Sequence, residues 1–255
     1  MDVRPKKHLG QHFLVDQNIA RKIVAALATD LNAVVEVGAG MGVLTQYLLP
    51  EYGEKLMVIE IDKESIDYLH DNFKGLDDAH LVEGDFLKSN LAVLAAERVG
   101  VIGNFPYNIS SQIFFHILDY RDCVSEVVGM VQKEVAERIS AKPGNKIYGI
   151  LSVLLQAWYN IEYLFTVNEN VFNPPPKVKS AVIRLTRNNK VILGCNEKLF
   201  VSIVKQAFNQ RRKTMRNSLR SLLNDEIIGN PIFDKRPEQL SVDEFVELAK
   251  LIDKP

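Results

Sequence analysis

A glycine-rich run, GAGMG at residues 38–42, constrains the fold of this chain more than any other feature. It follows a short β-branched segment, AVVEV at residues 33–37, and precedes a helical pattern through Leu44, Tyr47 and Leu48. Glycines allow positive φ angles and a close approach of the backbone to a ligand. A strand, a glycine turn and a helix therefore predict an α/β sheet with a ligand at the turn. The spacing differs from the Gly-x-Gly-x-x-Gly fingerprint of dinucleotide-binding proteins.

Polar side chains also close the three apolar segments that follow along the chain. Glu60, Asp85 and Asn104 each stand at the end of a predicted strand. Parallel strands end at the same edge of a sheet, so these three groups and the glycine turn predict one ligand site. Glu60 follows the turn by roughly twenty residues, where an acidic residue typically accepts hydrogen bonds from ribose hydroxyls. A single acid is usually a solvated loop charge, but the repeated position favours a site.

The run NFPYNIS at residues 104–110 predicts a pocket for a flat nucleobase. An extruded base needs acceptors for its exocyclic amine and an aromatic face for stacking. Asn104 offers a side-chain oxygen, Pro106 lacks a backbone N–H that could donate, and Tyr107 offers a ring. The alternative is a strand-to-helix turn in which Ser110 caps the next helix.

Strand and helix patterns alternate from residue 33 to about residue 132, which predicts a largely parallel sheet covered by helices. Further strands are expected at 124–131, 161–167 and 178–185, and helices at 133–140 and 151–158. From residue 196 onward only helices are expected, at 199–208, 212–223 and 242–252. The sequence thus predicts an α/β domain over residues 1–190, with a basic arm at 1–14, and a small all-helical domain over 191–255.

The formal net charge of the 255 residues is -1, so a nucleic-acid-binding surface would have to be local. Six basic residues occur without an intervening acid in the helical region: Lys205, Arg211, Arg212, Lys213, Arg216 and Arg220. Arg212, Arg216 and Arg220 recur at i, i+4 spacing and are expected to form one helical stripe that can hold a phosphate backbone. The alternative is a solvated helix face.

The cysteines and histidines give no sign of a metal or disulfide framework. Cys123 and Cys195 lie in unrelated contexts, and the five histidines lack the His-Glu-x-x-His spacing, so no metal is expected. The first seven residues have no apolar core of signal-peptide length, and no segment approaches the length of a membrane span. The sequence therefore predicts a cytoplasmic protein without a membrane partner.

Four more motifs occur in order along the chain: LGQHFL at 9–14, QKEV at 132–135, FNPPPKV at 172–178 and AFNQRRKT at 207–214. With these motifs, which extend over nearly the whole length, the chain resembles the ribosomal RNA adenine dimethyltransferases of the KsgA type, which act on small-subunit RNA. The resemblance implies a Rossmann-like sheet of the S-adenosylmethionine-dependent methyltransferases and a helical C-terminal domain that binds rRNA.

The resemblance also implies where the ligands bind. In that family S-adenosylmethionine is bound at the positions that match His12, Leu14, Gly38, Glu60, Asp85 and Asn104. Gly40 of the glycine turn is expected to join them. The family usually has Asn where this chain has His12, so a different side-chain contact is expected there. Phe172 is implied as the ring on the second face of the base, opposite Tyr107.

The implied activity is dimethylation of N6 in two adjacent adenines of a 16S rRNA hairpin near the 3′ end, during assembly of the small subunit. Asn104 and the Pro106 carbonyl are expected to accept the two amine hydrogens, so that positioning supplies much of the rate. The implied partner is small-subunit rRNA in a pre-ribosomal particle, bound by a monomer. DNA is not expected as a partner.

Three alternatives remain open. A DNA adenine methyltransferase would use a similar Asn/Asp-Pro-Pro-Tyr pocket, but Phe105 replaces the first proline here. A large-subunit rRNA adenine methyltransferase would share fold and pocket, whereas the AFNQRRKT run favours the small-subunit group. A non-catalytic ribosome-assembly or transcription factor would keep only the fold, and the intact strand-end polar residues argue against it.

Overall fold

The computed structural model describes residues 3–77, 79–94 and 97–253 of the chain. Two compact units emerge: Met1–Ala136 with Ile161–Arg187, and Glu137–Asn160 with Asn188–Pro255. The sequence analysis assigned residues 137–160 to the α/β domain, whereas here they pack with the C-terminal helices. Residues 1–2 of the expected arm and 254–255 of the expected helical domain lie outside the described residues.

Among the described residues, a seven-stranded sheet forms the centre of the first unit. Its strand order is β4-β3-β2-β5-β6-β9-β7. Its strands are β2 (Ala33–Val37), β3 (Leu56–Glu60), β4 (Leu81–Glu83), β5 (Val99–Asn104), β6 (Val124–Gln132), β7 (Tyr159–Val167) and β9 (Ser180–Arg187). A separate antiparallel pair joins β1 (Phe13–Leu14) to β8 (Phe172–Asn173). The predicted α/β class is confirmed.

The strand order creates a crevice at one edge of this sheet. β2, β3, β4, β5 and β6 pair in parallel, and β9 pairs antiparallel with β6. From β2 the chain moves outward to β3 and β4, and then returns to β5 on the other side of β2. Helices that leave β2 and β5 in opposite directions leave space beyond the carboxyl ends of these two strands, where open α/β sheets bind ligands.

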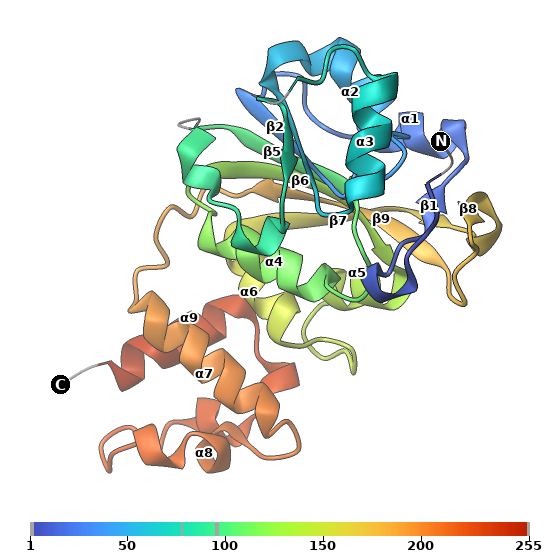
Figure 1. Cartoon of the computed structure of the whole chain (residues 1–255). Coiled ribbons are helices and arrows are strands. Elements are labelled where there is room, and N and C mark those ends of the chain that lie inside the picture. The colour runs from blue at the N-terminus through green and yellow to red at the C-terminus, as the bar shows by residue number, and fades with distance from the viewer. Residues whose placement is uncertain (1–2, 78, 95–96, 254–255) are drawn as a thin grey trace. The chain divides into compact units, whose positions relative to one another are not determined.

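Helices cover both faces of the sheet. The first unit contains α1 (Gln17–Val24), α2 (Thr45–Tyr52), α3 (Lys63–Asn72) and α4 (Ser110–Asp119), and α5 (Lys133–Ser140) crosses the boundary between the units. α2 and α3 lie on one side of the sheet and α4 on the other (Figure 1). This cover buries all five residues of β2, including the polar Glu36. Buried parallel strands are accordingly apolar in nearly continuous runs.

The second unit is helical. It contains α6 (Ile150–Trp158), α7 (Glu197–Asn209), α8 (Met215–Ser218) and α9 (Val242–Ile252). Its core includes ring contacts between Trp158 and Phe200 and between Phe208 and Phe245, each with centroids 5.9 Å apart. The predicted cap of the last helix is confirmed, because Ser241 Oγ accepts from Glu244 N at 3.2 Å.

The predicted helix over residues 212–223 is wrong. α8 spans only Met215–Ser218, and a 3-10 turn at Arg220–Leu222 follows it. Asn217 and Ser218 are weak helix formers, and Met215 N donates to Lys235 O at 2.8 Å, which ties the start of α8 to a distant segment. Arg212 precedes this helix and Arg220 follows it, so the expected stripe on one helix does not form.

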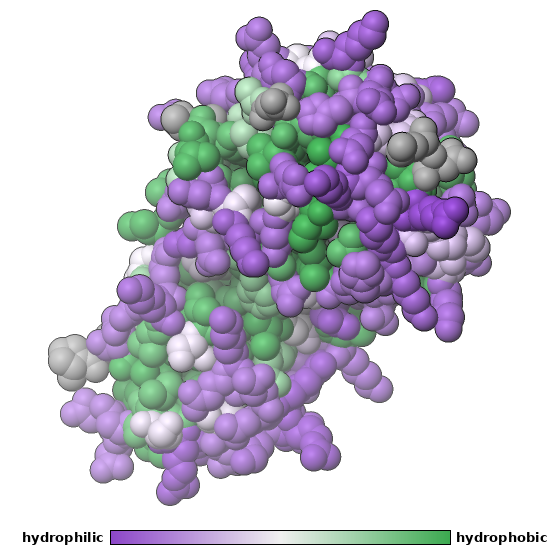
Figure 2. All heavy atoms as spheres, in the orientation of Figure 1, coloured by the Kyte–Doolittle hydropathy of each residue, from purple (hydrophilic) through white to green (hydrophobic). Residues whose placement is uncertain are grey.

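Hydrophilic side chains cover most of the face drawn in Figure 2, with apolar patches between them. Within the described part of the chain, no helix combines the length and apolar character that a membrane crossing requires.

Candidate active site

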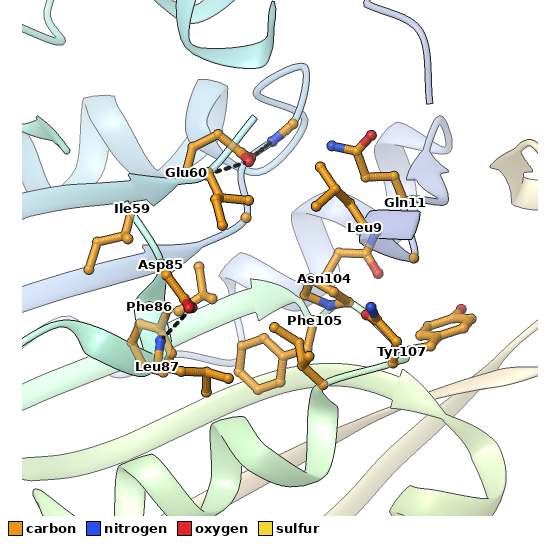
Figure 3. Close-up of a pocket in the computed structure, with 18 of the residues that line it drawn as sticks. Leu9, Gln11, Ile59, Glu60, Asp85, Phe86, Leu87, Asn104, Phe105 and Tyr107 are labelled. Carbon is orange, nitrogen blue, oxygen red and sulfur yellow. Dashed lines mark hydrogen bonds between the residues drawn. The ribbon is translucent and has the colours of Figure 1, made fainter. Parts of the chain in front are cut away.

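The first unit contains a pocket at the carboxyl ends of β2, β3 and β5. Residues of the N-terminal arm form its opposite wall, as Figure 3 shows for Leu9 and Gln11. Of the predicted site residues, the pocket brings together His12, Gly38, Gly40, Glu60, Asp85, Asn104, Pro106 and Tyr107. The strand-end reasoning therefore brought the glycine turn, Glu60, Asp85 and Asn104 together, whereas His12 was implied by the resemblance, and Pro106 and Tyr107 by the NFPYNIS run.

Backbone N–H groups surround the Glu60 carboxylate at the end of β3. Oε2 accepts from Gly40 N at 2.9 Å, and Oε1 accepts from Ile61 N at 2.8 Å and Asp62 N at 2.9 Å. Glu60 is 4% exposed, and burial raises the pKa of its carboxyl, although the three N–H donors oppose this shift. A carboxylate has about four acceptor positions, so Oε2 retains one for a ligand hydroxyl.

The backbone of the glycine turn favours glycine over residues with a side chain. Gly38 and Gly40 have φ angles of 70° and 57°, a region that L-residues with a side chain rarely adopt. A Cβ atom on Gly40 would lie 2.7 Å from the Phe13 ring. Glu60 thus holds a turn whose backbone faces the pocket. Farther along the same edge, Asp85 Oδ1 accepts from Leu87 N at 3.0 Å (Figure 3).

Asn104, the last residue of β5, is held from both sides. Its Nδ2 donates to the His12 carbonyl at 2.8 Å. The next residue, Phe105, is fully buried, and a Cβ atom on Gly129 would lie 2.6 Å from its ring. Because Nδ2 points toward His12, the acceptor oxygen Oδ1 lies on the other branch of the amide. The Pro106 carbonyl already accepts from Ile109 N at 3.2 Å and retains one lone pair.

The Tyr107 ring has a partner that the sequence did not indicate. Its ring stacks on His12, with centroids 5.4 Å apart and planes at 27°. Its hydroxyl forms a hydrogen bond with Ser180 Oγ, and burial raises the pKa of the phenol. His12 Nδ1 donates to the Pro174 carbonyl at 2.8 Å, which requires the proton on Nδ1 because a carbonyl only accepts. One face of Tyr107 is thus covered by His12.

The N-terminal arm, defined here as residues 3–14, is attached to α3 beside Glu60. The Lys6 ammonium bonds to the Asp62 carboxylate, and Gln11 Nε2 donates to Asp62 Oδ2 at 3.0 Å. Burial would raise the pKa of Asp62, but Lys6 and Gln11 keep it below its usual range. The sequence analysis missed Asp62 because its only local signal, a cap before a helix, gives no hint of a partner 56 residues away.

Leu14 and Phe172 lie away from this pocket. They pair across β1 and β8, and both are 3% exposed within the main core. Leu14 also lines a second cavity, which shares Phe13, Gly38 and Asn104 with the first. Phe172 lines neither cavity, so the structure does not bring it to the expected position opposite Tyr107.

The basic residues of the second unit differ in their surroundings. Arg216 bonds through Nη2 to Asp234 Oδ1 at 2.6 Å, and also to the Ile228 carbonyl. Arg211 Nε lies 3.9 Å from Glu238 Oε2. Lys205, Arg212, Lys213 and Arg220 are exposed. Arg216 therefore stabilises its own unit, although the sequence analysis included it among the RNA-binding residues.

The residues present fit S-adenosylmethionine. The positive φ angles of the glycine turn present its backbone to the pocket, Glu60 retains an acceptor for a ribose hydroxyl, and apolar groups such as Ile61 and Leu87 also line the pocket. A metal site has no comparable support, because the described residues contain no group of three or more His, Cys, Asp or Glu that could hold an ion.

The chain is similar to known proteins over nearly its whole length. The profile of the family described as ribosomal RNA adenine dimethylase matches residues 3–254. Ribosomal RNA small subunit methyltransferase A of Parabacteroides distasonis is 59% identical over 255 residues, which cover 99% of this chain and 95% of the relative. The protein of the same name from Cytophaga hutchinsonii is 58% identical, with 98% of each chain covered.

Solved structures of two methyltransferases superpose on this chain over most of its length. A dimethyladenosine transferase from Plasmodium falciparum superposes with a TM-score of 0.77 at 26% identity, over 93% of this chain and 96% of that one. The 23S rRNA methyltransferase ErmE shares the fold, with a TM-score of 0.69 at 24% identity, over 93% and 99% of the two chains. The resemblance read from the sequence is confirmed: this chain belongs to the ribosomal RNA adenine dimethylase family, whose members are S-adenosylmethionine-dependent methyltransferases.

Proposed function

We propose that this enzyme dimethylates N6 of two adjacent adenines in a small-subunit rRNA hairpin near the 3′ end, and that Asn104 accepts a hydrogen bond from the reacting amine. The observation that carries the proposal is the bond from Asn104 Nδ2 to the His12 carbonyl. It fixes which end of the amide is the donor, and so supplies an acceptor oxygen at the end of β5, beside the cofactor pocket.

Adenine N6 is a weak nucleophile because its lone pair is delocalised into the ring. Asn104 Oδ1 and the Pro106 carbonyl accept the two N6 hydrogens and favour a pyramidal nitrogen, which returns the lone pair for attack. When bound, S-adenosylmethionine supplies the electrophilic methyl group. No strong general base is needed, since the acidity of the nitrogen rises once it carries the methyl group. Much of the rate comes from positioning.

Tyr107 stacks on the base through the ring face that His12 does not cover. Phe172 would have to leave the core to reach a base, and we retain its role on the second face only as a prediction. Cofactor contacts are assigned to His12, Gly38, Gly40, Glu60, Asp85 and Asn104, and a contact from Leu14, which lines only the second cavity, is retained as a prediction. Among these, Glu60 accepts from a ribose hydroxyl.

Arg211 and Arg216 are retained as RNA contacts only as a prediction, and the contacts are assigned mainly to the exposed Lys205, Arg212, Lys213 and Arg220. Their exposure supports this role, because solvated cations can exchange counterions for phosphates. We propose that the substrate is a pre-ribosomal particle, that a monomer binds it, and that the protein acts in the cytoplasm. The bacterial relatives named above favour small-subunit over large-subunit RNA.

Mapping of methylated adenines tests the proposal. Small-subunit particles from cells that lack the enzyme are incubated with the purified protein and S-adenosylmethionine, and large-subunit particles serve as a parallel substrate. We expect two adjacent dimethylated adenines in small-subunit RNA alone. Methylation confined to large-subunit RNA would favour the large-subunit alternative. Binding to particles without methylation would favour an assembly factor.

A further inference from the structure

Positive charge is concentrated in the second unit. Residues 137–160 and 188–255 contain 15 Lys and Arg against 10 Asp and Glu, a formal charge of +5. The first unit contains 16 basic and 22 acidic residues, a charge of -6, which together with +5 gives the -1 of the whole chain. A nearly neutral chain thus carries one unit that attracts a polyanion and another that repels it.

A loop far from the C-terminal helices in sequence belongs to this positive unit. The loop, residues 141–149, contains Lys142 and Lys146. Two contacts anchor it. Gly144 N donates to the Glu238 carbonyl at 2.7 Å, and the Tyr148 ring packs edge-on against Phe208, with centroids 6.0 Å apart.

Both anchors lead to the turn at residues 210–213, which follows α7. Phe208 lies two residues before this turn, and the side chain of Glu238 faces Arg211 of the turn at 3.9 Å. The loop and the turn therefore share neighbours, although about 65 residues of sequence separate them. Sequence reasoning could not connect them, because no local pattern relates a loop to a distant turn.

The cations at these two places are available for a ligand. Lys142, Lys146, Arg212 and Lys213 are exposed, and within the described residues none of the four has a carboxylate oxygen within 4.0 Å. Other cations of the unit are paired, such as Lys190 with Asp243 and Lys235 with Glu244. Like charges that have no carboxylate partner repel one another, and a phosphate backbone relieves that repulsion.

We propose that loop 141–149 and turn 210–213 form one phosphate-binding surface for the substrate RNA, in which Lys142 and Lys146 complement Arg212 and Lys213. This rests on the proposed function, since the ligand is the RNA of the small-subunit particle. It adds to that function a second contact segment from the middle of the chain, between β6 and β7.

The test compares charge reversals by their effect on the salt dependence of binding to unmethylated small-subunit particles. For Lys142→Glu with Lys146→Glu, the slope of log Kd against log salt should fall by about one for each lysine. At about 0.15 M salt, affinity should fall about fivefold or more for each lost contact. Calorimetric titration with S-adenosylmethionine should give the wild-type affinity and so report an intact pocket.

Lys198→Glu is the matched control, because Lys198 is exposed, lies in the same unit and undergoes the same change of charge. It stands near the start of α7, roughly 15 Å along the helix from Phe208, and the salt-dependence slope of this variant should equal that of the wild type.

Arg212→Glu with Lys213→Glu tests the proposed RNA contacts themselves. If only this second pair weakens binding, the loop is not part of the surface and the inference fails while the proposed function stands. If neither pair weakens binding, both assignments fail.

Discussion

Asn104 and His12 are 92 residues apart in sequence, and a hydrogen bond of 2.8 Å joins the side-chain amide of the first to the backbone carbonyl of the second. The bond attaches the N-terminal arm to the end of β5. It also decides the orientation of the amide, since a carbonyl partner can only face the NH₂ group. This one hydrogen bond therefore attaches the arm beside the pocket and orients the acceptor oxygen of Asn104.

Asn104→Ala should slow methyl transfer by raising its activation free energy by roughly 2 to 4 kcal/mol. The substitution removes an acceptor whose hydrogen bond is strongest in the transition state. Asn104→Asp should also lose activity, since a carboxylate oxygen would face the His12 carbonyl. Single-turnover rates on small-subunit particles measure both effects, and binding to the particle should stay near that of the wild type.

Asn108→Ala provides the control for this prediction. Asn108 lies on the same loop and its Nδ2 also donates to the arm, to the His8 carbonyl at 3.3 Å, but it is exposed. We expect its rate to change much less. Equal losses in the two alanine variants would mean that attachment of the arm, rather than the Asn104 acceptor, determines the rate.

Glu60→Gln should weaken S-adenosylmethionine binding by roughly 1.5 to 3 kcal/mol, the usual contribution of a hydrogen bond to a charged group. A glutamine has one acceptor oxygen for three backbone N–H donors and the ribose, so part of the glycine turn loses its partner. Calorimetric titration measures the change. Glu83→Gln is the control, because Glu83 pairs with Glu60 in the sheet register but is exposed. Unchanged affinity in Glu60→Gln would place the ribose elsewhere.

The sequence was sufficient where local pattern decides structure. Runs of buried β-branched residues located β2, β3 and β5, and the polar residues that end these strands came together because parallel strands share an edge. The glycine turn was predicted from its three glycines, and all three have positive φ angles in the structure. Local pattern thus predicted the floor of the pocket and its chemistry.

It was insufficient where distant segments decide structure. The i, i+4 spacing of Arg212, Arg216 and Arg220 predicted one helix, but α8 contacts residues 228–235 and ends after one turn. One of these contacts is the bond of Arg216 to Asp234. The role of Asp62 and the stacking of His12 on Tyr107 depend on where the arm lies, which no periodicity encodes.

Lys6→Ala should raise the KM for S-adenosylmethionine about two- to fivefold and change kcat less, because the ammonium that pairs with the buried Asp62 carboxylate and holds the arm over the pocket is lost. The Lys6 ammonium also lies 3.2 Å from Glu64. Initial rates over a range of cofactor concentrations provide the measurement, and limited proteolysis within residues 3–14 should become faster.

Lys7→Ala removes an equal charge from the next residue, which is exposed and has no ion pair within the described residues. Its KM should match that of the wild type. A similar rise in both variants would show that the general charge of the arm matters and that the contact with Asp62 does not.

Glu36→Gln should change the pH dependence of stability. Burial raises the pKa of Glu36 from 4.5 to about 8, although Thr45 Oγ1 donates to its Oε2 at 2.7 Å. Between these two values the folded state keeps a proton that the unfolded chain has lost, so stability falls as pH rises, by up to about 1.4 kcal/mol per pH unit. The amide that replaces the carboxyl does not titrate and can still accept from Thr45. The variant should therefore lose this slope and be more stable than the wild type above pH 8.

Urea unfolding of the cofactor-free protein from about pH 5 to about pH 9 measures the effect as a difference between the two proteins, which cancels every carboxyl that they share. Glu51→Gln serves as control, because Glu51 is exposed on α2 and its replacement removes the same charge. Its stability curve should run parallel to that of the wild type. A parallel curve for Glu36→Gln as well would mean that Glu36 is ionised in the folded protein at neutral pH. Its burial would then have to be offset by a cation or by water within the second cavity, which it lines.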